Sequence, residues 1–356
     1  MYRIILKTTV VIFGLAMHAH AFAFGEPITT TITIDQPSTN IKQTAAPLKK
    51  EVILINLQLS DATKAAIGRN FANRSKLSAS ISFAAADNAL PAKINLGMHD
   101  VPVLDQGRHG ACVTFAAIAA IDAILGKGDY ISALCSLELG SYLEERGYMS
   151  SGWQGSLGPW VLDQIVRFGI VNHQNQVTRS CANVTQYPTE DHTTGAPMPL
   201  DEFRTMSENL NSKFYYVPHM NYFQRIDTGL SDIAQAASTL NQIKRALANG
   251  NRLILGAVLV LAPNCDAGAC ATYHKTKDTW AITKDLDLLY DDLAGHELVI
   301  SGYDDNAIAV DSSGVKHKGL LTLRNSWSDA AGDHGNYYMT YDYFVQFSHE
   351  VNEIVA

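Results

Sequence analysis

The 356-residue sequence has little charge: Asp, Glu, Lys and Arg make up 17% of it, and they form no basic run. A net charge of −8 gives no attraction to nucleic-acid phosphates or to an anionic membrane. After the N-terminal segment, no apolar run approaches the roughly 18 residues of a transmembrane helix. The longest, residues 253–261, has the length of a strand. These absences argue against a nucleic-acid-binding protein and against a membrane span.

Residues 1–23 have the composition of a secretory signal peptide. Arg3 and Lys7 give a basic start, residues 8–17 form an apolar core, and Ala21 and Ala23 provide small-residue cleavage sites. We therefore expect a secreted protein, extracellular or periplasmic, in a compartment where disulfides can form.

The five cysteines of this exported chain can form two disulfides and leave one thiol over. Cys265 and Cys270 flank a Gly/Ala loop and can close on each other. Cys135 and Cys181 would then pair across the helical half of the chain. Other pairings are possible, but this one keeps Cys112 free.

Cys112 stands at the start of an apolar stretch. From Cys112 to Leu125 the only charged residue is Asp122 and no helix breaker occurs, which predicts a helix buried on nearly all sides. A thiol in the first turn of a helix faces unpaired N–H groups and the positive end of the helix dipole, which favour the thiolate. The stretch predicts a nucleophile, with a merely buried or disulfide-bonded cysteine as the alternative.

The rest of the pattern divides the chain into an N-terminal region, a helical half and a strand-rich half. Residues 24–95 contain two alternating stretches typical of a hairpin, then a helix at 62–74 and an Ala/Ser-rich stretch at 78–91 that suits a cleavable linker. Further helices are predicted at 136–146, 160–168 and 240–248, and strands at 252–261, 297–303, 307–310, 319–323 and 337–341. Residues 181–232 are expected to be irregular. Helices followed by strands predict an α+β chain with two packed lobes.

A cysteine nucleophile needs a base, usually histidine, and the histidine needs an acceptor that fixes its tautomer. His296 opens an apolar strand, whereas the other histidines lie in polar or loop-like stretches. Asn325 follows another strand and can accept from the imidazole N–H, and Trp327 can shield that bond from water. Alone, each of these residues is more often structural, so the prediction depends on the set.

The order Gln, Cys, His, Asn resembles the papain/cathepsin-like (C1-type) family of cysteine peptidases. The main matching stretches are PVLDQGRHGACVTFA, AGHELVISGYDD and LTLRNSW…GDHGNYYMTY, supported by SLELGSYL, GPWVLDQIVRFGIV and IKRALANGNRLILGAV. The resemblance implies a papain-like two-lobed α+β fold over residues 96–356. Its helical lobe would span about 96–180 and its antiparallel β-barrel-like lobe about 240–356, with insertions at 181–232 and 262–294.

The same resemblance implies a role for each matching residue. Cys112 would be the nucleophile, His296 the base and acid and Asn325 its orienter, while Gln106 and the Cys112 N–H would form the oxyanion hole. Cys112 and His296 would rest as a thiolate–imidazolium pair, each charge stabilising the other. No metal and no organic cofactor is required. The implied substrate-binding residues are Gly155, Ser156, Leu157, Gly158, Gly295, Glu297 and Trp327.

Several features depart from the family pattern. Val113 stands where the family usually has Trp, Arg108 and His109 occupy the stretch of a missing disulfide cysteine, and Glu297 replaces a common small residue. The separation of Cys112 and His296, 184 residues (296 − 112), exceeds the roughly 130–150 typical of the family. These departures concern specificity more than activity.

We expect a secreted, monomeric cysteine endopeptidase that is made as a zymogen and acts on proteins or peptides. Residues 24–95 take the position of a pro-segment, and we hypothesise that they mask the cleft until they are removed or displaced. An accessory subdomain that stays attached is the alternative for this region. For the whole chain, an amidase or transpeptidase with the same acyl-transfer residues, or a catalytically silent binding protein, remain the other interpretations.

Overall fold

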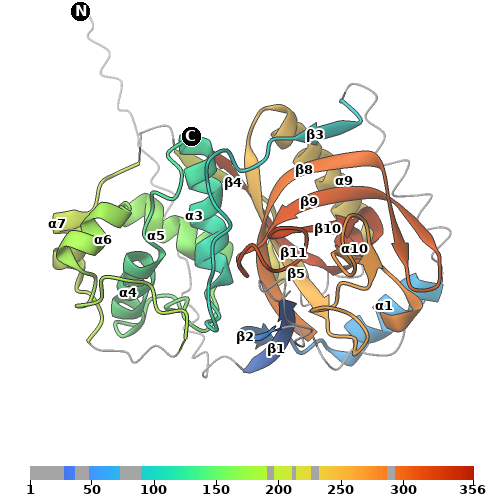
Figure 1. Cartoon of the computed structure of the whole chain (residues 1–356), viewed down its shortest axis with the longest axis horizontal. Helices are drawn as coiled ribbons and strands as arrows, with labels where there is room; N and C mark the ends of the chain where they lie inside the picture. The colour runs from blue at the N-terminus through green and yellow to red at the C-terminus, as the bar shows by residue number, and fades with distance from the viewer. Residues whose placement is uncertain are drawn as a thin grey trace, which may run out of the picture.

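The computed structural model describes residues 28–36, 48–72, 90–190, 196–210, 214–225, 232–286 and 293–356. The predicted signal peptide and most of the predicted linker lie outside these ranges. The described residues form a helical lobe and a β lobe that lie side by side (Figure 1). The predicted two-lobed α+β architecture is therefore confirmed.

The helical lobe is organised around α3 (Cys112–Leu125), which lies between the other helices and the β lobe (Figure 1). Its residues from Cys112 to Ala123 are all buried, as its apolar sequence predicts. The helix ends at Gly126, whose φ of 64° is a left-handed conformation that glycine adopts without strain. The surrounding helices are α4 (Ala133–Glu144), α5 (Gly158–Phe168), α6 (His173–Arg179) and α7 (Leu200–Met206).

The β lobe is built on β8 (Leu293–Asp311), which pairs antiparallel with β5 (Arg252–Val260) and β9 (Lys316–Arg324). The predicted strands 297–303 and 307–310 are one strand, with a register irregularity between Asp304 and Ile308. The remaining strands are β3 (Lys93–Asn95), β4 (Tyr215–Met220), β6 (Ala271–Thr272), β7 (Thr279–Trp280), β10 (Asn336–Thr340) and β11 (Ser348–Val355). The helical elements of this lobe are α8 (Tyr222–Gln224), α9 (Ile233–Ala248), η2 (Lys284–Leu286) and α10 (Tyr341–Phe347).

The prediction that residues 181–232 are irregular was wrong in part, because this range contains α7, β4 and α8. Strand β4 pairs with β11, so part of this stretch belongs to the sheet of the β lobe. Helix α9 begins at Ile233, earlier than predicted, since the Asp232 side chain accepts from the backbone N–H of Gln235 and caps the helix there.

The N-terminal region forms the N-terminal hairpin, β1 (Thr29–Gln36) paired with β2 (Leu48–Asn56), followed by α1 (Asp61–Ala72). On β1 the side chains of Ile32 and Ile34 are buried, while Thr31 and Thr33 are exposed, as the period of two requires. The buried side chains join the hydrophobic core of the β lobe. The hairpin lies at the lower edge of the molecule, where the two lobes meet (Figure 1).

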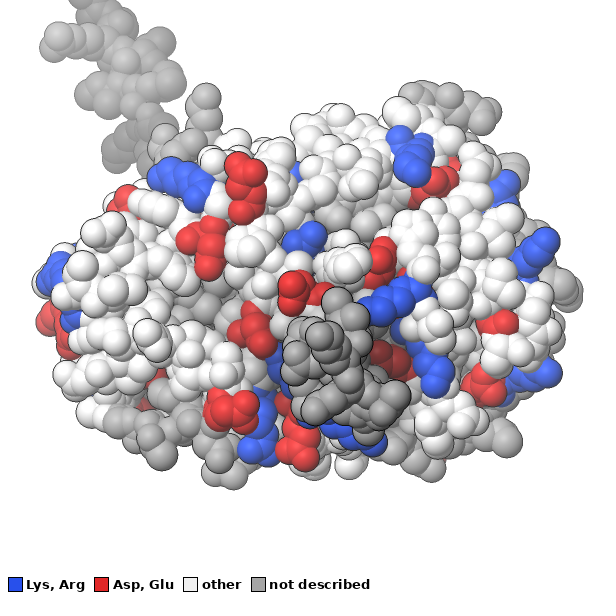
Figure 2. Space-filling model, viewed as in Figure 1, with Lys and Arg blue, Asp and Glu red and all other residues white. Residues whose placement is uncertain are grey.

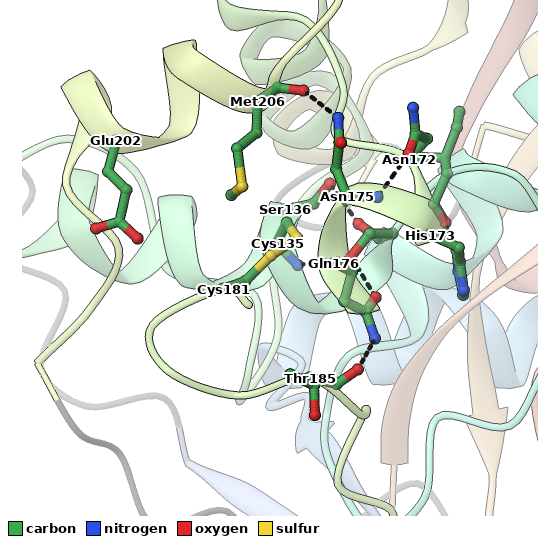
Figure 3. The surroundings of a disulfide bond; sticks show 12 residues. Cys135, Ser136, Asn172, His173, Asn175, Gln176, Cys181, Thr185, Glu202 and Met206 are labelled. Carbon is green, nitrogen blue, oxygen red and sulfur yellow. Dashed lines mark hydrogen bonds between the residues drawn. A yellow bond between two sulfur atoms is a disulfide. The ribbon is translucent and has the colours of Figure 1, made fainter. Parts of the chain in front are cut away.

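Two disulfides join the predicted pairs, Cys135 with Cys181 and Cys265 with Cys270, and leave Cys112 free. The first connects α4 to the residues that follow α6 (Figure 3). Basic and acidic side chains are interspersed on the face drawn in Figure 2, so this face carries no broad field of one sign. Among the described residues, no helix has the length and apolarity needed to cross a membrane.

Candidate active site

The Cys112 thiol lies at the first residue of α3, and no side chain of the described residues caps this helix end. Ala111 occupies the cap position and has no acceptor to offer, so the first N–H groups of the helix are not taken by a cap. The backbone N–H groups of Cys112 and Val113 act on the sulfur and favour its thiolate. The positive end of the helix dipole therefore acts on the Cys112 thiol and not on a capping side chain.

His296 lies in β8, and its imidazole is oriented by Asn325, the residue that follows β9. His296 Nε2 donates to Asn325 Oδ1 at 2.8 Å. The Ser326 backbone N–H donates to the same oxygen at 2.7 Å, which fixes the orientation of the amide. Because that oxygen can only accept, the proton is on Nε2 and the lone pair is on Nδ1. His296 Nδ1 is buried and has no hydrogen-bond partner among the described residues, as a waiting base requires.

Cys112 and His296 are brought close where α3 packs against β8. The backbone N–H of Glu297, the residue next to His296, acts as a hydrogen-bond donor to the Cys112 sulfur. The candidate nucleophile of the helical lobe therefore lies beside the residue that follows the candidate base on the β lobe.

Trp327 lies under this pair and has no exposed surface. Its ring stacks on the His296 imidazole with centroids 4.5 Å apart and an angle of 22° between the planes. It can keep water from the His296–Asn325 bond, but the prediction that it lines the accessible cleft is not supported by its burial.

Gln106 connects the two lobes. Its Nε2 donates to the His109 carbonyl at 2.8 Å, and its Oε1 accepts from Ser326 Oγ at 2.7 Å. Its backbone N–H also donates to the Ser326 carbonyl at 2.9 Å. A carboxamide nitrogen carries two hydrogens, so a second donor remains for an oxyanion. Ser326 was not predicted, although it follows Asn325 directly in the sequence.

Burial sets the protonation of the pair in this structure. It raises the pKa of the Cys112 thiol to about 12, against the backbone N–H groups that lower it. It lowers the pKa of His296 to about 4, against the Asn325 hydrogen bond that raises it. Both shifts favour the uncharged form. Burial of the covered site therefore opposes the predicted thiolate–imidazolium pair.

The site is covered by β2. Ile55 pairs with Gly295 and Asn56 with Ala294, so β2 adds to the edge of β8 next to His296. On the other side, the Ile53 N–H donates to the Arg108 carbonyl at 2.7 Å. One extended segment therefore bridges from the β lobe to the helical lobe.

Side chains of β2 contact the helical lobe at three places. A Cβ built on Gly155 would lie 2.1 Å from Ile55 Cδ1, so the helical-lobe wall has room for Ile55 only because residue 155 is glycine. Lys50 pairs with Asp105, and Glu51 Oε2 lies 2.9 Å from Arg108 Nη2. Both ion pairs join β2 to the loop that carries Gln106.

The other predicted substrate-binding residues lie at the start of α5 or, in the case of Glu297, in β8. Leu157 is the cap residue of α5, and Ser156 Oγ is buried without a hydrogen-bond partner among the described residues. A Cβ on Gly158 would lie 2.1 Å from Glu350 Oε1, so Gly158 packs against β11. Glu297 is 3% exposed, and its carboxyl lies by Gly256.

Glu350 was not predicted and forms a buried acid pair with Glu297. Burial raises the pKa of Glu350 to about 8 and, together with the Glu350 charge, raises that of Glu297 well above its usual value. Both carboxyls are therefore uncharged in the folded chain at mildly acid pH and charged in the unfolded chain. The pair destabilises the fold as the pH rises from 4.5 towards about 8, and it has no such effect below the unfolded pKa.

The variant Glu350→Gln tests whether the buried acid pair lowers the free energy of unfolding as the pH rises. Gln keeps an oxygen that can accept from Asn352 and removes the ionisation, so we expect the variant to gain free energy of unfolding over wild type between pH 4.5 and about 8, and little below. Urea unfolding across this range measures the difference. Glu190→Gln, at an exposed position, is the control and should leave the free energy of unfolding nearly unchanged. An unchanged pH dependence in Glu350→Gln would contradict the assignment.

Among the described residues, no group of three or more His, Cys, Asp or Glu side chains could hold a metal ion.

No family model and no curated protein matches the chain. Among solved structures it is similar to xylellain, a cysteine protease from Xylella fastidiosa, at a TM-score of 0.49 and 16% identity over 93% of this chain and 97% of that one. The proform of the ragweed pollen cysteine protease Amb a 11 matches at a TM-score of 0.45 and 14% identity, over 75% of this chain and 66% of its own. Procathepsin L 3 from the larval midgut of Tenebrio molitor matches at 0.40 and 16%, over 75% and 71%.

Proposed function

We propose that this chain is a secreted, papain-like cysteine endopeptidase, made as a zymogen in which β2 occupies the substrate cleft. The observation that carries the proposal is the hydrogen bond from His296 Nε2 to Asn325 Oδ1. Because Nε2 is occupied by this bond, the lone pair on His296 Nδ1 is available as a base. Cys112, whose thiol is free, is the first residue of the buried helix α3. The two disulfides support an oxidising compartment.

In the uncovered enzyme the proton of the Cys112 thiol passes to His296 Nδ1, and the sulfur attacks the carbonyl carbon of a peptide bond. The carbonyl oxygen becomes an oxyanion that accepts from Gln106 Nε2 and from the Cys112 N–H, where one such donor is typically worth on the order of 10²–10³ in rate. The C–N bond breaks as His296 returns the proton to the leaving amine. Water then attacks the thioester, His296 takes its proton, and the carboxylic acid and the thiol are released.

The N-terminal hairpin would act as the mask. An extended substrate needs the backbone edge of β8 at Gly295 and the space over Gly155, and Ile55 of β2 takes both. The neutral thiol and imidazole of the covered site agree with an inactive state. Removal or displacement of the hairpin would return water and the substrate to the pair and favour its charged form.

Labelling with a peptide epoxide tests the function. At mildly acid and at neutral pH, mass spectrometry should find the adduct on Cys112, slowly in the full chain and faster once the hairpin is displaced. The variant Cys112→Ala should carry no adduct. An adduct on Cys135 or Cys265 would contradict the assignment. New amide bonds among the products, instead of shortened peptides, would favour the transpeptidase interpretation.

A further inference from the structure

The loop of residues 105–111, which carries Gln106, is bound by a segment that the catalytic scheme does not use. Tyr187 Oη donates to the Gln106 carbonyl at 2.9 Å, and the Arg108 N–H donates to the Thr189 carbonyl at 2.9 Å. His109 Nε2 lies 3.0 Å from the Pro188 carbonyl. Three successive residues, 187–189, are thus each bonded to this loop.

The loop follows the segment closely. Gly107 has a φ of 62°, and a Cβ there would lie 2.1 Å from the Thr189 carbonyl oxygen. No side chain fits between the two backbones at this point, and the φ is one that residues other than glycine rarely adopt. The path of the Gln106 loop is therefore determined by contact with residues 187–189.

An aromatic cluster fixes the Tyr187 ring. The ring stacks on Trp153 at a centroid distance of 5.7 Å and meets the edge of Phe115 of α3 at 5.0 Å. His109 packs on both Tyr187 and Trp153, at 5.9 and 5.0 Å. Burial raises the pKa of Tyr187 well above its usual value, so its hydroxyl keeps the proton that it donates. Contacts of this kind restrict the ring to one orientation.

The segment is also anchored at its start. Cys181 is joined to Cys135 of α4, and Gln176 of α6 donates through Nε2 to the Thr185 carbonyl at 2.9 Å, as Figure 3 shows. Thr185 is two residues before Tyr187. The anchor connects residues 187–189 to two helices of the lobe, so the segment can serve as a rigid support.

We propose that Tyr187 is a positioning residue for the oxyanion hole: through the Gln106 carbonyl it holds the backbone from which the Gln106 amide reaches the reacting oxygen. This inference rests on the proposed function. The Tyr187 hydroxyl bonds the Gln106 carbonyl, so its removal should act on oxyanion stabilisation. Donors of this kind lose their effect when they are displaced by about an ångström, which gives their support a catalytic consequence.

The variant Tyr187→Phe keeps the ring and removes the donor. In the full chain with the hairpin displaced by Ile55→Asp, we expect kcat for peptide hydrolysis to fall about tenfold, with KM nearly unchanged, since the interaction matters in the transition state. Alkylation of Cys112 by iodoacetamide forms no oxyanion, so its rate should not change. Tyr142→Phe, in α4 of the same lobe, is the matched control and should leave both rates unchanged.

A double mutant separates positioning from structure. Gln106→Ala should lower kcat on the order of 10²-fold, and adding Tyr187→Phe should then lower it no further, because the group that Tyr187 positions is gone. An equal tenfold loss in both backgrounds would overturn the proposal, as would a parallel loss of alkylation rate in Tyr187→Phe. Failure of the proposed function gives a different result, since the parent chain would then show no turnover that depends on Cys112.

Discussion

The variant His296→Ala is expected to lower kcat for peptide hydrolysis by about three orders of magnitude, measured in the chain whose hairpin is displaced. It removes the acceptor of the thiol proton and the donor to the leaving amine, and such acid–base catalysis contributes roughly 10²–10⁴ in rate. The thiol also loses the cation that would stabilise its charge. Initial rates on a peptide substrate and iodoacetamide alkylation of Cys112 should both fall.

His219→Ala provides the matched control. His219 lies in β4 and its Nε2 is 2.7 Å from Glu353 Oε2, so this variant also removes a hydrogen-bonded imidazole from the β lobe. We expect kcat to stay nearly unchanged. Circular dichroism of both variants should report an intact fold. Similar losses of kcat in the two variants would show that any lesion in this lobe reduces turnover, and His296 would lose its assignment as the base.

Two residues of the candidate site were predictable because they lie at the ends of strongly patterned elements. Cys112 begins an uninterrupted apolar helix, and Asn325 follows the end of β9 at Arg324. Apolar periodicity gives the existence of such elements, and the chemistry of the residue at the end gives its candidate role. The pairing of Cys135 with Cys181 was predicted once Cys112 was taken as free and the short loop between Cys265 and Cys270 was taken as closed, although the count of cysteines also allows other pairings.

The strand β11 could not be predicted, because its sequence SHEVNEIV looks polar. Glu350 and Asn352 are buried, and Asn352 Nδ2 donates to Glu350 Oε1 at 2.9 Å. A polar residue that is paired inside the protein has the same sequence signal as one that is exposed, so hydropathy placed these residues outside the core. The acid pair with Glu297 was missed for this reason.

The protonation state of Cys112 and His296 also depends on a contact that leaves no local signal in the sequence. Ile55 and Gly295 are far apart in the sequence, and nothing near either residue specifies that they pair. The charge state of Cys112 follows from burial by such long-range contacts. The sequence therefore predicts which groups react, and the tertiary structure determines whether they are charged.

Displacement of the N-terminal hairpin by Ile55→Asp is expected to raise the alkylation rate of Cys112 at pH 7 by on the order of 10³. A thiol with a pKa of about 12 is thiolate in roughly one part in 10⁵ at that pH, whereas an ordinary thiol with a pKa of about 8.5 is thiolate in about 3%. An aspartate at this place puts a charge against Gly155 and at the edge of β8, so the strand pairing should be lost. Peptide turnover should rise with alkylation.

Two controls decide whether the backbone pairing of β2 or its ion pairs keep the N-terminal hairpin over Cys112. Thr31→Asp adds the same charge to the exposed side of β1 and should leave the rate unchanged. Glu51→Arg breaks the partly exposed pair with Arg108, a contact worth about 0–1 kcal/mol, so it should raise the rate by less than about tenfold. If Ile55→Asp gave no more than this small increase, β2 would not be the element that suppresses Cys112. A large increase confined to Ile55→Asp would assign the suppression to the backbone pairing with Gly295 and the side chain over Gly155, the two contacts that a substrate would have to replace.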